Sequence, residues 1–158
     1  MEADRQKDEV IRLRQRIAEV FPKHGPPSKL GASLESEPRA QKLLRGRKWD
    51  DLEWKQIAEI GDRWLLLRPE AFRYFLPAFL LASLDELERA GNAGLAQLVV
   101  FALTPDDRTR SRFDTRFSPL PLEQRQVIRS FLQVMADHGS WLVLEGAEEA
   151  LQAYWRET

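Results

Sequence analysis

The most concentrated group of chemically active side chains is an arginine cluster in the segment DRTRSRFDTRF. Its members are Arg108, Arg110, Arg112 and Arg116. Alternate arginines would share one side of an extended segment and form a row of forked donors for phosphate or carboxylate. Asp106, Asp107 and Asp114 lie among them and are available for local pairing. We expect a solvated or internally paired loop, with anion or nucleic-acid contact as the alternative.

Motifs for catalysis, cofactors or metals are missing. The two histidines, His24 and His138, have no accompanying G-x-S-x-G element, and the chain lacks a G-x-x-x-x-G-K-[ST] phosphate loop. The absence of cysteine excludes disulfides, thiolate zinc sites and cysteine nucleophiles, and two histidines are too few for a histidine-rich metal site. Paired acids such as Asp50–Asp51 and Glu148–Glu149 suit helix starts better than catalysis. We predict no cofactor and no metal, and we favour a non-enzymatic protein, with a carboxylate-based enzyme beside Pro77 as a minor alternative.

Five tryptophans are a high count for 158 residues. In the segment WDDLEW, Asp50 and Glu53 have the spacing of a capping box, and Trp49 and Trp54 have the spacing of a hydrophobic staple. We therefore expect a helix at about 51–60 that ends at Gly61. The sequence gives no comparable role for Trp64, Trp141 or Trp155. We expect core packing for these, and an exposed one would be a contact candidate because tryptophan is enriched in interface hot spots.

The periodicity of apolar residues predicts a mainly α bundle of about six or seven helices in a single domain, 1–158, with at most two short extended segments. Helices are predicted near 10–20, 38–46, 51–60, 69–90, 121–139 and 147–155. Segment 95–103 is compatible with helix or buried strand, although helix is favoured. Loops are predicted at 22–38 and, rich in arginine, at 105–119, with a turn at 91–94. WLLL (64–67) and SWLVL (140–144) are read as the extended segments.

A proline lies within the most apolar run of the chain, RPEAFRYFLPAFLLASL. The three-and-four spacing of Phe72, Phe75, Phe79 and Leu84 continues through Pro77, so we predict one proline-kinked central helix. A proline in a helix interior costs ~3 kcal/mol, and packing of the flanking aromatic residues is the expected compensation.

Charge and composition limit the cellular locations and the classes of partner that we expect for this protein. The formal net charge is −1, hydrophobic residues make up 43% and charged residues 31%, values typical of a folded soluble protein. The charged start and the short apolar runs predict a cytoplasmic protein without membrane contact. Segment 108–129 carries a net charge of +4 and segment 137–158 a net charge of −4. The two segments would either attract one another within the fold or present opposite faces to two different partners.

Several segments together resemble an uncharacterised bacterial family of small helical proteins, a domain of unknown function. They are Ile17-x-x-x-Phe21, the helix start at Trp49, PEAFRYFLPAFL, RFSPLPLEQRQVIRSFL and Ala150-Leu151-x-x-Tyr154-Trp155. The resemblance implies a shared helical fold and no established chemistry. Leu120-Pro121 departs from the small polar cap expected before the helix at Glu123.

These observations lead to one functional hypothesis and one main alternative. We predict a non-catalytic cytoplasmic protein-binding module, of a regulatory or immunity type, whose candidate contacts are the four arginines and Trp64, Trp141 and Trp155. The alternative is binding of an anion, nucleotide or nucleic acid through Arg108–Arg116.

Overall fold

The computed structural model describes residues 2–89 and 94–157, in which the regular structure is helical and contains no strand. Its α-helices are α1 (Glu2–Val20), α2 (Pro38–Leu44), α3 (Trp54–Ile60), α4 (Pro69–Glu88), α5 (Leu95–Ala102), α6 (Arg110–Phe117), α7 (Leu122–His138) and α8 (Trp141–Ala153). Short 3₁₀ helices cover Ala32–Leu34, Trp49–Asp51, Gly61–Leu66, Asp107–Thr109 and Trp155–Glu157. The prediction of a mainly α bundle is confirmed.

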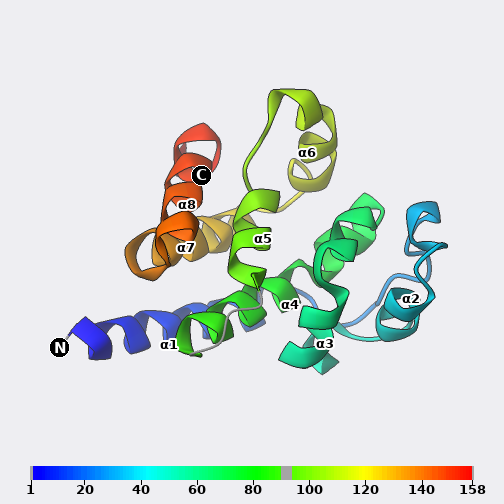
Figure 1. Ribbon diagram of the computed structural model, residues 1–158, viewed down its shortest axis with the longest axis horizontal. Helices are drawn as coiled ribbons and strands as arrows, with labels where there is room; N and C mark the ends of the chain where they lie inside the picture. The colour runs from blue at the N-terminus through cyan, green and yellow to red at the C-terminus, as the bar shows by residue number, and fades with distance from the viewer. Residues whose placement is uncertain (1, 90–93, 158) are drawn as a thin grey trace.

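Helix α4 lies at the centre of the bundle, where it packs against α1, α3, α5 and α6. Figure 1 shows α1, α7 and α8 together on one side and α2 and α3 on the other, with α4 and α5 between them. Most side chains of α4 between Ala71 and Leu84 are buried, as expected for a helix that is apolar around most of its circumference. Across the described residues, no helix combines the length and the apolar character needed to cross a bilayer.

Helix α4 continues through Pro77, as the periodicity predicted, and Pro77 itself is buried. The indole of Trp64 stacks on Phe72 and on Phe79, with ring centroids 4.3 Å apart in both pairs and interplanar angles of 7° and 10°. Its Nε1–H donates to the carbonyl of Phe72 at 3.3 Å. Aromatic packing on both sides of Pro77 therefore offsets the cost of the proline in the helix.

Both predicted extended segments are helical. The WLLL segment contributes to the 3₁₀ helix Gly61–Leu66, and SWLVL forms the first turn of α8, with Ser140 as its N-cap residue. Segment 95–103 is likewise resolved as helix α5. Short apolar runs do not distinguish helix from strand, and no strand is present among the described residues for these runs to pair with.

The capping box of α3 lies three residues after its predicted place. Glu53 is the N-cap residue, its side chain accepts from the N3 backbone N–H, and its own N–H donates to Gln56 Oε1 at 3.0 Å. The predicted cap Asp50 instead lies in a 3₁₀ helix, in which Trp49 donates its indole N–H to the Pro22 carbonyl at 2.9 Å. Trp49 is thereby drawn into the core, and the α-helix begins only at Trp54.

The two predicted loops differ in outcome. The loop predicted at 22–38 contains the 3₁₀ helix Ala32–Leu34, and its last residue, Pro38, already begins α2. Segment 105–119, predicted as an arginine-rich loop, instead contains Asp107–Thr109 and helix α6, because Phe113 and Phe117, one turn apart, bury the same face of that helix. The predicted turn at 91–94 lies outside the described residues except for Gly94, which precedes α5 with φ at +76°.

Candidate protein-binding surface

The four arginines lie in different environments: Arg108 belongs to the 3₁₀ helix Asp107–Thr109, and the other three belong to α6. Arg110 pairs with Asp114, with Nε and Oδ1 3.0 Å apart, and its guanidinium lies over the rings of Phe113 and Tyr154 at 5.7 and 5.4 Å. Arg110 therefore contributes to the contact between α6 and the C-terminal turn. The extended row of forked donors is absent, since the segment is helical.

Arg116 is the most embedded of the four. Its Nη2 donates to the Leu65 carbonyl at 2.7 Å, and its guanidinium carbon lies 4.4 Å from the centroid of the Phe72 ring. Burial lowers the pKa of the Arg116 guanidinium, and the nearby charge of Arg112 acts in the same direction. Arg116 thus fixes α6 to α4 and is poorly placed to bind a ligand.

Arg108 and Arg112 are exposed. Within residues 2–89 and 94–157, neither guanidinium forms an ion pair, while the backbone N–H of Arg108 donates to Asp106 Oδ1 at 2.9 Å. These two are therefore the exposed arginines of the cluster that form no ion pair among the described residues, whereas Arg110 is exposed but paired with Asp114.

The three tryptophans without an assigned role lie in different environments. Trp64 and Trp155 are fully buried, and the indole N–H of Trp155 donates to the Leu103 carbonyl at 2.7 Å. Both belong to the core and are excluded as surface contacts, in line with the core packing expected for them. Trp141, the first residue of α8, is 69% exposed.

Two further large apolar side chains are exposed on neighbouring helices. Phe101 on α5 is 69% exposed and Leu142 on α8 is 56% exposed, and both line one hollow of about 480 Å³. Leu142 directly follows Trp141 in the chain. Exposed apolar residues that gather at one place, rather than singly, mark sites of interaction.

A glycine brings the two helices together. A Cβ on Gly146 would lie 2.8 Å from Val100 Cγ1, closer than side-chain contacts allow. Helix α8 therefore approaches α5 closely at this position, which places Phe101 and Leu142 on the same hollow.

Charged residues of opposite sign border the exposed apolar side chains. Asp106, Asp107 and Glu149 line the hollow that Phe101 and Leu142 share. Phe101 also lines a second hollow, of about 200 Å³, together with Arg112 and Arg116. We call the set Phe101, Leu142, Asp106, Asp107, Glu149 and Arg112 the Phe101 surface.

Sequence reasoning did not identify Phe101 or Leu142. In α5, Val99, Val100 and Ala102 are buried and Phe101 is exposed. Because this segment is apolar at nearly every position, its periodicity does not indicate which face is exposed. Among the described residues, the cluster able to hold a metal ion is Glu9, Asp137 and His138, which sequence analysis also missed because α1 and α7 are far apart in the chain.

Comparison with known proteins adds one finding. The model of a family of unknown function (DUF6714) matches residues 28–158. No curated protein and no solved structure was found to match.

Proposed function

We propose that this chain, which belongs to the family of unknown function DUF6714, is a protein-binding module that contacts its partner through the Phe101 surface. The observation that supports this most is the sharing of one hollow by Phe101 and Leu142, two exposed apolar side chains from different helices. An aromatic and an aliphatic side chain bordered by polar groups match the usual composition of an interface centre and its rim.

The charges suggest the character of the partner surface. Asp106, Asp107 and Glu149 line the larger hollow with Phe101, whereas Arg112 lines the smaller one, which Asp106 also lines. A complementary partner would present an apolar pocket or ridge with basic groups toward the acids and an acidic group toward Arg112. Such a pattern fixes orientation and selects against wrong partners. Trp141, which precedes Leu142 in the chain, is a further exposed apolar side chain on α8.

The test is capture of partners on the immobilised protein from lysate of its source organism, at low and high salt, with mass spectrometry and detection of nucleic acid. Phe101→Ser combined with Leu142→Ser is the test variant. Ile11→Ser is the matched control, because Ile11 is also an exposed apolar residue, at 52%, but lies on α1. The proposal expects one discrete protein that survives high salt, is retained by the control and is lost by the double variant.

Two outcomes would contradict the proposal. Retention of the same partner by the double variant would remove the Phe101 surface as the contact. Capture of nucleic acid alone, released by salt, would favour the alternative function through Arg108 and Arg112, because phosphate contacts weaken steeply with salt.

We also propose a cytoplasmic location in a bacterial cell. The support is the ordinary globular composition, with 31% charged residues, together with the resemblance of the sequence to a bacterial family. Fractionation of the source cells, with detection of the untagged protein by antibody, tests this, and recovery outside the cytoplasmic fraction would contradict it.

A further inference from the structure

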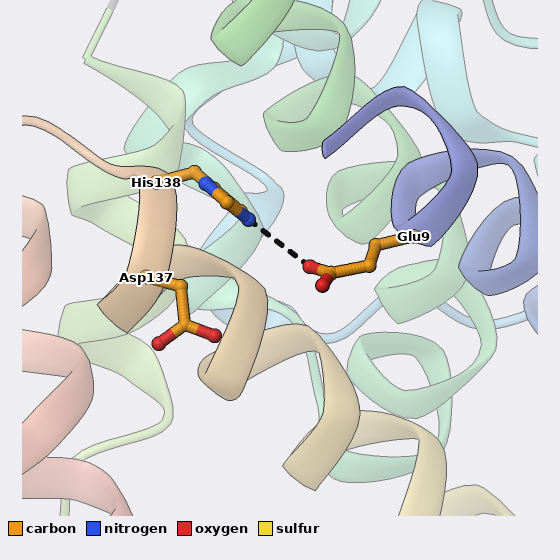
Figure 2. A group of neighbouring side chains, drawn as sticks. All are labelled: Glu9, Asp137 and His138. Atoms are coloured by element: carbon orange, nitrogen blue, oxygen red, sulfur yellow. Dashed lines mark hydrogen bonds and ion pairs between the residues drawn. The ribbon is translucent and has the colours of Figure 1, made fainter. Parts of the chain in front are cut away.

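Three side chains able to ligate a metal meet where the first helix crosses the end of α7. Glu9 comes from α1, and Asp137 and His138 are the last two residues of α7. One potential ligand atom from each lies within 4.8 Å of the others, and His138 Nε2 is 3.0 Å from Glu9 Oε2. Figure 2 shows the imidazole of His138 directed at the Glu9 carboxylate, with Asp137 at the neighbouring position of the same helix end.

The surroundings hold these groups at a partly enclosed place. The side chain of His138 is 10% exposed and that of Glu9 is 25% exposed, whereas Asp137 lies at the surface. Asp137 Oδ1 accepts a hydrogen bond from Gln133 Nε2 at 3.1 Å, one turn earlier on α7. Glu9 and Asp137 also line a groove of about 470 Å³ between α1 and α7, which gives an ion access from solvent.

We propose that Glu9, Asp137 and His138 form a binding site for a divalent transition-metal ion of the Zn²⁺ class. An imidazole with two carboxylates suits such an ion, and a set without sulfur does not select a soft one. Ligand atoms about 2.1 Å from a tetrahedral zinc lie roughly 3.4 Å from one another. The present separations, from 3.0 Å to within 4.8 Å, require only small side-chain movements.

Binding replaces the contact between His138 and Glu9 with two metal–ligand bonds. His138 must then offer the lone pair of Nε2, so any proton on that atom leaves to solvent. With three protein ligands the ion keeps a further position for water or another ligand, and the adjoining groove has room for it.

The site has a consequence for the attachment of the first helix. Glu9 lies outside residues 28–158, the part that matches the family, while Asp137 and His138 lie within it. A bound ion would therefore link α1 to the end of α7 through its coordination bonds.

The test uses untagged protein, since a histidine tag would itself bind the probe. Zn²⁺ binding is measured by titration calorimetry, and Co²⁺ is added as a spectroscopic probe of tetrahedral coordination. We expect one ion per chain and a rise in the unfolding temperature with Zn²⁺. Asp137→Asn should weaken Zn²⁺ binding on the order of tenfold or more, and His138→Gln should abolish the visible Co²⁺ band.

His24→Gln is the matched control, because His24 is the other histidine of the chain, and it should leave the affinity unchanged. Since Asp137 is exposed, Asp137→Asn keeps the fold and decides the question even where His138→Gln is unstable. The proposal is overturned by absence of Zn²⁺ binding in the unmodified chain, by unchanged affinity in Asp137→Asn, or by loss of binding in His24→Gln.

Discussion

The guanidinium of Arg116 lies over the face of Phe72, with its central carbon 4.4 Å from the ring centroid. This contact joins α6 to α4, and the hydrogen bond from Arg116 to the Leu65 carbonyl reinforces it. A residue from the arginine cluster that looked like a ligand-binding group is therefore part of the scaffold.

Replacing Arg116 should consequently lower stability. We expect Arg116→Ala to reduce the free energy of unfolding by about 2 to 4 kcal/mol, through loss of a partly desolvated cation–π contact and a charged hydrogen bond. Arg112→Ala, an exposed neighbour, should change it by less than about 0.5 kcal/mol. Urea denaturation of both variants gives the comparison, and equal effects would contradict the division of the cluster into structural and solvent-facing members.

The close approach of α8 to α5 predicts a coupled pair. Gly146→Ala places a methyl group against Val100 and should cost about 1 to 3 kcal/mol through overpacking. Val100→Ala in the same chain should recover part of that loss, because it removes the atom in conflict. A double-mutant cycle by thermal or urea unfolding measures the coupling, and additive effects of the two changes would argue against close packing at this point.

Substitutions at Pro77 and Trp64 test whether aromatic packing is the reason that α4 tolerates its proline. Pro77→Ala should leave stability equal or higher, since relief of up to about 3 kcal/mol from the helix exceeds the packing lost with the ring. Trp64→Ala should destabilise by about 3 to 5 kcal/mol, because it removes a buried indole stacked on two phenylalanines. Circular dichroism with urea titration distinguishes the two variants. Loss of partner binding in Pro77→Ala without loss of stability would instead point to a functional site near the proline.

A side chain of α4 caps the start of α5. The two carboxylate oxygens of Glu86 accept from the backbone N–H groups of Leu95 and Ala96 at 3.0 and 3.3 Å. Glu86→Ala should therefore cost about 1 to 2 kcal/mol, the usual cost of losing an acceptor and a negative charge at a helix N-terminus. Glu88→Ala, at an exposed position two residues along, is the control and should be nearly neutral. Hydrogen exchange of the α5 amides should accelerate only in the Glu86 variant.

The carboxylate of Glu70 predicts a pH dependence. A hydrogen bond from its own backbone N–H, followed by one from Arg68, lowers the pKa of Glu70 in the folded chain. A depressed folded pKa adds stability above the unfolded pKa, and this stability is lost as the pH falls through the folded value. Glu70→Gln should thus be less stable than the unmodified chain at neutral pH, and the difference should close in acid. Parallel urea titrations across this range give the result, and a constant difference would count against the assignment.

Local patterns in the sequence were sufficient for the helices with a clear apolar face. The continuity of α4 through Pro77, the helix after Pro121 and the mainly α class all follow from short-range periodicity, which depends on residues three and four apart. The core roles of Trp64 and Trp155 were also the expected outcome for tryptophans. Predicting these features does not require knowing which helices pack against one another.

Tertiary structure decided the rest. The 105–119 segment became helical because Phe113 and Phe117 found a core to enter, and SWLVL became helical where no strand among the described residues was available to pair with it. The candidate sites depend on residues distant in the chain: Phe101 meets Leu142 through the packing of α5 on α8, and Glu9 meets His138 through that of α1 on α7. Such pairings arise from side-chain complementarity between helices, which the spacing of residues within one helix does not encode.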